Sequence, residues 1–197
     1  MKKIIYTAII IIGLVSSTKA QVSTFGFNYN IAIPTGNLGD YVSLASYQGA
    51  SFEYTYVPDE SFGVHFEGGW NNFYEKKKNA SFERGTATLT GTQYRYSTNV
   101  PLLVGLNYFF LPESTVSPYV AVAAGTVYSR WRTEVGLYSL YADAWQFAFK
   151  PELGVNIGLS ENSFIHLSTK YYQTIKTNDL KGQSFIAFNI GLAFTVE

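Results

Sequence analysis

Apolar and polar positions alternate along most of this sequence, and the pattern is clearest in its last stretch, residues 184–196. Bulky apolar side chains occupy the even positions, which are Ile186, Phe188, Ile190, Leu192, Phe194 and Val196. The odd positions between them are small or polar. Because successive side chains point to opposite faces of a β-strand, this period of two predicts a strand with one apolar face and one small, polar face.

The same period recurs in seven earlier segments, so the sequence predicts about eight strands. The earlier strands are expected at residues 24–33, 46–57, 62–70, 92–110, 117–131, 145–159 and 165–172. Tight turns are expected at 58–61, 111–114 and 160–163, and longer loops elsewhere, including a polar insert at 74–91 and a loop at 134–141. This alternation of short and long connections places three tight turns and both chain ends at one rim of the predicted fold.

The last strand ends almost at the end of the sequence, so one of its edges needs a partner from far back in the chain. A strand in lipid cannot leave an edge unpaired, and the first strand is the natural partner. The pattern therefore predicts an all-β fold, an eight-stranded antiparallel up-and-down transmembrane β-barrel. An even number of strands and short turns at one end are typical of bacterial outer-membrane barrels.

Volume decides which face of the barrel points outward. The interior of an eight-stranded barrel is just wide enough to be filled by side chains. The apolar face carries most of the 15 Phe and 16 Tyr residues, too much volume for that interior. A soluble, lipocalin-like barrel with that face inside is the alternative. We therefore expect the apolar face to contact lipid, with a rim of aromatic residues at the long-loop end: Trp70, Tyr74, Tyr94, Tyr96, Trp131 and Trp145.

The first 20 residues have the features of a secretory signal peptide. Lys2 and Lys3 precede an apolar run, which ends before small residues at Thr18 and Ala20. That run is shorter than the ~20 residues that a membrane-spanning helix needs. We therefore expect residues 1–20 to be a signal peptide and residues 21–197 to form the barrel.

Charge and cysteine content exclude some functions. Removing Lys2, Lys3 and Lys19 lowers the 14 basic residues to 11, against 14 acidic ones. A mildly acidic chain disfavours nucleic acid as a partner. The chain has no cysteine, which excludes disulfides and thiolate chemistry. With two histidines and no cysteine, no metal or other cofactor is expected.

The inward positions of the strands gather the charges that the barrel is expected to enclose. This lumen charge network comprises Glu53, His65, Glu67, Arg95, Lys150, Glu152, His166 and Lys170. Charges in a narrow, poorly hydrated lumen have to be paired, because an unpaired buried charge costs several kcal/mol. A salt-bridged plug is the favoured interpretation, and a gated, narrow porin-like channel is the alternative.

Two further motifs have a functional interpretation. His166 and Ser168 share a strand face, where an imidazole can activate a hydroxyl. This pair resembles the His-x-Ser pair of the lipid A deacylases of the outer membrane, so a lipid A-modifying enzyme is an alternative function. Lys76, Lys77 and Lys78, with Arg84 nearby, lie on the longest predicted loop, where they would face solvent or lipopolysaccharide phosphates.

The mature chain as a whole resembles the outer-membrane β-barrel domain family, of the small OmpA/OmpX-like porin-fold type found in Bacteroidetes-like bacteria. Its end resembles the assembly signal of such barrels, with Asn189, Gly191, Phe194 and Val196 in the corresponding positions, although the chain ends in Glu197 and not in an aromatic residue. The resemblance implies an outer-membrane protein with extracellular loops and periplasmic termini. We expect it to be a monomer that contacts lipopolysaccharide and the barrel assembly machinery.

We expect a non-enzymatic role in envelope integrity or surface adhesion, with the loops as the recognition surface.

Overall fold

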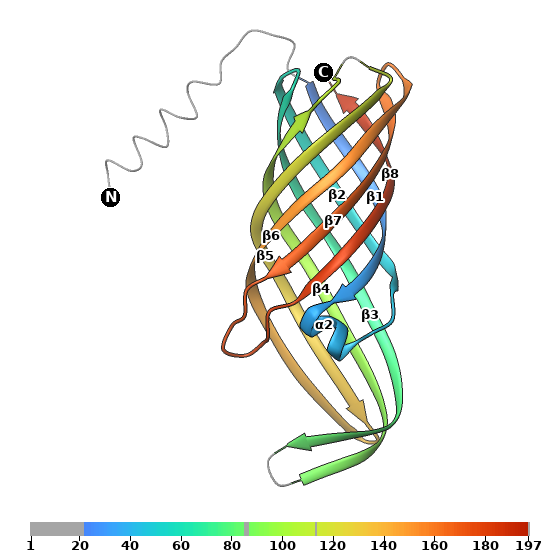
Figure 1. Ribbon diagram of the computed structural model, residues 1–197, viewed down its shortest axis with the longest axis vertical. Coiled ribbons are helices and arrows are strands. Elements are labelled where there is room, and N and C mark those ends of the chain that lie inside the picture. Colours follow the sequence, from blue (N-terminus) through green and yellow to red (C-terminus); the bar gives the residue numbers. More distant parts are fainter. Residues whose placement is uncertain (1–21, 85–86, 113, 197) are drawn as a thin grey trace, which may run out of the picture.

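Eight antiparallel strands form a closed barrel in the computed structural model of the chain. The structure describes residues 22–84, 87–112 and 114–196; within these ranges, the side chains of residues 79–90 are not described. The expected signal peptide lies outside the described residues. The strands are β1 (Val22–Thr35), β2 (Ser46–Asp59), β3 (Phe62–Arg84), β4 (Ala87–Phe109), β5 (Val116–Val135), β6 (Tyr138–Ser160), β7 (Ser163–Thr174) and β8 (Ser184–Val196). One short helix, α2 (Gly36–Tyr41), follows β1. Figure 1 shows the strands tilted around a common axis.

Each strand pairs with its neighbour in the sequence, and β1 closes the ring against β8. Their antiparallel ladder runs from Ser23 opposite Val196 to Thr35 opposite Ser184. The expected closure of the last strand on the first is therefore confirmed, as is the up-and-down order of eight strands. Among the described residues, no helix is long and apolar enough to cross a membrane.

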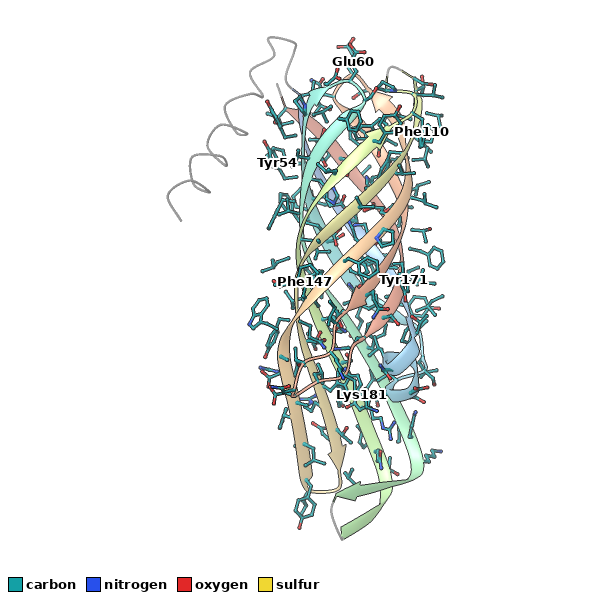
Figure 2. The ribbon with its side chains drawn as sticks, turned by 60° about the vertical axis from the view of Figure 1, so that its left-hand side comes forward. Tyr54, Glu60, Phe110, Phe147, Tyr171 and Lys181 are labelled. Carbon is teal, nitrogen blue, oxygen red and sulfur yellow. The ribbon has the colours of Figure 1, made fainter. Side chains whose placement is uncertain are left out.

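The facing of the strands follows the sequence pattern. Phe27 and Leu106 are 61% and 58% exposed, whereas their neighbours Asn28 and Asn107 are 4% and 6% exposed. The outer surface carries the bulky apolar side chains (Figure 2), and the interior carries Asn, Ser, Gln, charged residues and a few apolar ones. The prediction that the phenylalanine-rich face is outside is therefore confirmed.

Two of the expected loops are strands instead. The insert at 74–91 continues the ladder between β3 and β4 as far as Arg84 and Ala87, and the loop at 134–141 continues the ladder between β5 and β6. At the β5–β6 turn Gly136 has a φ of 58°, a conformation that glycine adopts without strain. Strands β3 to β6 consequently extend well past the others at one end of the barrel (Figure 1).

The short connections lie at the opposite end of the barrel, together with Val22 and Val196. They join β2 to β3, β4 to β5, and β6 to β7. This turn end matches the expected rim of three tight turns. The other end, which we call the sheet end, carries α2, the extended strands and the β7–β8 loop.

Candidate functional site: the lumen of the barrel

A cluster of buried charges fills the middle of the lumen, on side chains from β2, β3, β6 and β7. The Lys150 ammonium donates hydrogen bonds of 2.6 Å to Glu67 Oε2 and to Glu152 Oε2. Lys170 donates to Glu53 and, over 2.9 Å, to Glu67 Oε2. Both lysines and Glu67 are fully buried. Each ammonium thus bridges two carboxylates from different strands, which fixes the positions of these strands around the ring.

Two tyrosines complete the cluster, and neither was included in the expected charge network. The Tyr119 hydroxyl lies 2.6 Å from Glu152 Oε1 and 2.9 Å from His166 Nε2. The Tyr172 hydroxyl donates to Glu67. Only a glycine at position 154 leaves room for Tyr119, because a Cβ there would lie 2.4 Å from its ring.

Seven of the eight residues expected in the charge network come together, and Arg95 does not. Arg95 lies near the sheet end, where it donates to Gln93 and to the backbone carbonyl of Tyr41. His65 approaches Lys150 Nζ at 3.4 Å. The cluster therefore contains three carboxylates and two ammonium groups, and its net charge is −1 when both histidines are neutral. The expected network had three acids and three lysine or arginine residues, and without Arg95 the cluster has one cation fewer than it has carboxylates.

The lumen is closed on the sheet-end side of this cluster. Phe73, Tyr172 and Phe185 are buried directly beyond the charges, and the rings of Tyr172 and Phe185 stack at 4.5 Å. The helix α2 then places Leu38 in the apolar core of the lumen. The carbonyl and amide groups of Gln146 and Gln183 fill the remaining space with hydrogen bonds.

Tyr41 holds the end of α2 in place. Its ring stacks on Trp131 at 4.2 Å, its hydroxyl hydrogen-bonds with Thr133, and the Arg95 guanidinium lies 5.4 Å from the ring centre. Burial raises the pKa of Tyr41. Trp131 therefore points into the barrel, where its Nε1 donates to Gln183, and the prediction that it belongs to the outer aromatic rim is wrong.

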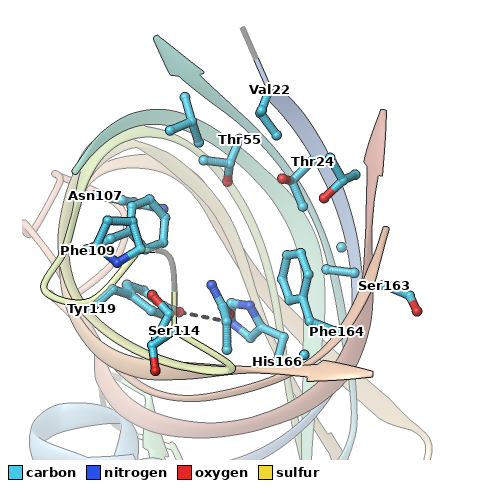
Figure 3. A pocket seen from close by; sticks show the side chains of 18 of the residues that line it. Val22, Thr24, Thr55, Asn107, Phe109, Ser114, Tyr119, Ser163, Phe164 and His166 are labelled. Carbon is cyan, nitrogen blue, oxygen red and sulfur yellow. Dashed lines mark hydrogen bonds between the residues drawn. The ribbon is translucent and has the colours of Figure 1, made fainter. Parts of the chain in front are cut away.

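On the other side of the cluster, the lumen is a cavity of about 380 Å³ near the turn end. Glu53, Tyr119 and His166 from the charge cluster are among its lining residues, and Phe109 and Phe164 contribute apolar wall (Figure 3). The sequence pattern did not predict this cavity, because parity gives the face of a residue and not how completely the interior is filled.

His166 and Ser168 both face the lumen, and each has a different partner. The hydrogen-bond partner of the His166 imidazole is Tyr119, and Ser168 Oγ accepts from Asn189 Nδ2 over 3.1 Å. A nucleophilic pair needs the imidazole within hydrogen-bond reach of the hydroxyl. The structure brings these two residues to one face without forming such a pair.

Two groups of side chains bring three metal-ligand atoms within 4.8 Å of one another: Glu53, Glu152 and His166, and also His65, Glu67 and Glu152. In both groups, the carboxylates already accept hydrogen bonds from Lys150 or Lys170. A cation at either place would lie close to two ammonium groups. The arrangement therefore favours the internal ion pairs over a metal ion.

The four residues of the expected assembly signal lie on β8. Phe194 and Val196 are exposed on the outer face, and Asn189 is buried in the lumen. Gly191 has a separate structural reason to be glycine, since a Cβ there would lie 2.1 Å from the Phe27 carbonyl oxygen of β1. Close approach of β1 and β8 at the closure of the ring requires the absence of a side chain at this position.

Comparison with known proteins identifies the fold. No family model matches the chain, and no curated protein matches it. Among solved structures, neisserial surface protein A is 14% identical with a TM-score of 0.55, covering 89% of this chain and 97% of its own. Ail, the attachment invasion locus protein of Yersinia pestis, is 13% identical over the same shares, with a TM-score of 0.52.

The outer membrane protease OmpT from Escherichia coli is 6% identical with a TM-score of 0.51, covering 92% of this chain and all of its own. These proteins differ in their described roles but share the architecture. At such identities the likeness concerns the fold alone. The chain has the transmembrane β-barrel fold of bacterial outer-membrane proteins.

Proposed function

We propose that this protein is a non-enzymatic integral protein of the bacterial outer membrane that acts through its outer surface, in envelope integrity or adhesion. One observation carries the proposal: the sheet of β3 to β6 continues past the barrel while the lumen behind it is closed by buried side chains. Towards the sheet end, Asn72 is the last residue of β3 that pairs with β2, and Ala148 is the last residue of β6 that pairs with β7. Beyond them the four strands continue as a projecting sheet, residues 73–84, 87–98, 130–135 and 138–147, which pairs with no other strand of the described chain. Only at its base do Phe73 and Gln146 contact Phe185 of β8 and Thr174 of β7.

The chemistry of the projecting sheet suits contact with anionic groups. Lys76 lies 5.3 Å from the centre of the Tyr94 ring. Arg132 lies 4.2 Å from the centre of the Tyr96 ring and also pairs with Glu134 at 3.4 Å. Lys78 is exposed, and Lys77 pairs with Glu75 at 3.6 Å; the side chain of Arg84 lies outside the described ones. Cations held beside aromatic rings at a membrane boundary can bind phosphates, and we propose lipopolysaccharide as the partner.

The proposed orientation places the turn end in the periplasm and the projecting sheet outside the cell. Short periplasmic turns and longer external segments are the rule in this class of barrel. The ring is closed, so no strand edge within the barrel needs a second copy, which supports a monomer. We propose that the barrel assembly machinery reads the end of β8, where Phe194 and Val196 are exposed.

The closure of the lumen on its sheet-end side and the separate partners of His166 and Ser168 support this role over a channel or a lipid A-modifying enzyme. Both residues are largely buried inside the barrel, whereas an enzyme acting on lipid needs them at the bilayer.

The test is a charge reversal on the projecting sheet in the native host. Lys76→Glu with Lys78→Glu should reduce adhesion of whole cells or raise their sensitivity to bile salts, while the amount of folded, heat-modifiable barrel stays unchanged. The control is Lys176→Glu, an exposed lysine of the β7–β8 loop. A loss of lipid A acyl chains that depends on Ser168, or a steady conductance of the purified barrel in planar bilayers, would contradict the proposal.

A further inference from the structure

The tip of the β5–β6 hairpin exposes apolar side chains on the part of the sheet that extends past the barrel (Figure 1). Leu137 is fully exposed, and the nearby Tyr138 and Tyr141 are 64% and 60% exposed. A single exposed leucine is common on a protein surface, whereas several adjoining apolar side chains mark a contact site. The strand ladder is paired up to Val135 opposite Tyr138, so the tip is held by the sheet. No other part of the described chain covers Leu137.

A run of three lysines, residues 76–78, lies level with this tip on the other edge of the projecting sheet. The strand ladders place Lys77 opposite Gln93, and Gln93 opposite Val135. Val135 in turn lies opposite Tyr138 of β6. One row across the four strands therefore joins the lysine run to the apolar tip. With about 4.8 Å between neighbouring strands, roughly 14 Å of sheet separates them.

The projecting sheet as a whole is basic, although the rest of the chain after residue 20 is acidic. Its basic residues outnumber its acidic ones, with Lys76, Lys77, Lys78, Arg84, Arg95, Arg130 and Arg132 against Glu75, Glu83, Glu134 and Asp143. The basic residues in the rest of residues 21–197 are Lys150, Lys170, Lys176 and Lys181, and acidic residues outnumber them. Positive charge is therefore concentrated on the part of the molecule that carries the apolar tip, which favours an anionic partner.

The side chains of the tip are ordered like the layers of a lipid surface. Leu137 is aliphatic and lies outermost, the rings of Tyr138 and Tyr141 follow, and the lysine run is level with Tyr138. Aliphatic side chains enter the acyl boundary, tyrosine rings prefer the headgroup level, and lysines attract anionic headgroups. The tip is also convex, and its chemistry changes with depth alone. These features suit a fluid lipid surface better than a shaped protein pocket.

We infer that the β5–β6 tip docks into the surface of an anionic phospholipid bilayer, with Leu137 and Tyr138 between the headgroups and the lysine run on the phosphates. This bilayer belongs to a facing membrane, because about eight residues of strand, roughly 26 Å, separate Leu137 from Trp145 near the barrel. The inference rests on the proposed function in one respect: it names a further partner of the projecting sheet. It does not require that the sheet bind lipopolysaccharide.

The test measures binding of the mature barrel, held in phosphatidylcholine nanodiscs, to separate vesicles of mixed phosphatidylcholine and phosphatidylglycerol by co-sedimentation. Leu137→Asp should lower the partition coefficient at least about tenfold, because it removes a leucine from the apolar phase. Vesicles of phosphatidylcholine alone should bind at least about tenfold more weakly, because they do not attract the lysine run. The matched control is Leu44→Asp, at an exposed leucine between α2 and β2, which should leave binding unchanged.

A second measurement reports whether the tip enters the lipid. Because the chain has no cysteine, Ser139→Cys can carry a single environment-sensitive fluorophore at an exposed position beside the tip. Its emission should shift to the blue with the anionic vesicles and stay unchanged with phosphatidylcholine vesicles.

Four results would overturn the inference. The first is equal binding of Leu137→Asp and the wild type, and the second is equal binding to both kinds of vesicle. The third is binding without a blue shift, which would mean that charge alone holds the vesicles. The fourth is an absence of vesicle binding; if Leu137→Asp then still reduces adhesion of whole cells, the tip has a protein partner instead.

Failure of the inference and failure of the proposed function are separate outcomes. The vesicle measurements use no cells, whereas the proposed function fails if Lys76→Glu with Lys78→Glu changes neither adhesion nor bile-salt sensitivity of the native host.

Discussion

Replacing Lys150 with methionine tests the buried ion cluster most sharply. Lys150 is fully buried, and its ammonium group lies 2.6 Å from both Glu67 Oε2 and Glu152 Oε2. Lys150→Met keeps most of the side-chain volume and leaves three carboxylates with one ammonium group. Removing one partner of a buried ion pair costs about 3–5 kcal/mol, because the remaining charge stays desolvated. We expect the free energy of unfolding to fall by about that amount.

The measurement is urea unfolding of the barrel in phosphatidylcholine vesicles, followed by tryptophan fluorescence and by heat-modifiable gel mobility. The double variant Lys150→Met with Glu152→Gln removes one positive and one negative charge. It should therefore be more stable than the sum of the two single losses, by about 0.5–3 kcal/mol. Lys176→Met is the control, and it should change stability by less than about 0.5 kcal/mol because Lys176 is exposed. A loss below about 1 kcal/mol for Lys150→Met would refute the account, since it would mean that the cluster is well hydrated.

Three further predictions concern other parts of the barrel. Leu106→Arg should destabilise the barrel by about 2–4 kcal/mol in vesicle refolding, because it places a charge against lipid; Asn107→Arg should be milder, and equal losses would contradict the facing of β4. Gly191→Val should slow or abolish refolding through its clash with β1, whereas wild-type folding yields would show that the two strands can separate there. Burial raises the pKa of Tyr41 in the folded protein. The contribution of Tyr41 to the free energy of unfolding is therefore complete below the usual pKa of about 10 and is lost as the pH rises through the raised pKa. Trp131 fluorescence should change above about pH 10, and Tyr41→Phe should remove this change; a change that persists in Tyr41→Phe would locate the titration elsewhere.

The barrel itself was predictable from the sequence because lipid imposes a strict period of two on every strand that it contacts. Phe27 and Asn28, or Leu106 and Asn107, reveal the facing of their strands without any structure. The same reason explains why the sequence pattern wrongly predicted two loops. Residues 74–91 and 134–141 belong to strands that extend past the barrel, where both faces of a strand can be polar and the alternation disappears.

The sequence predicted which side chains face the lumen but not where they lie along the barrel axis. Parity placed Arg95 inside together with Lys150, although Arg95 lies near α2 and not at the charge cluster. Height along the axis depends on the stagger between strands, which the sequence pattern does not contain. Tyr119 was missed because β5 is rich in Ala and Val on both faces, so its inward residues did not stand out. The turn-end cavity depends on how glycines and large side chains fit together and has no linear signal.

The central claim is that lipid contacts one face of every strand and a packed polar interior contacts the other. The chain has no cysteine, so single-cysteine variants from position 186 to 194 of β8 can each carry a spin label without further changes. The measurement is the accessibility of each label to dissolved oxygen in lipid vesicles. The account predicts a period of two, with high values at Phe188, Ile190 and Leu192 and low values at Ala187 and Asn189. Uniform values along the strand, or maxima at the odd positions, would contradict it.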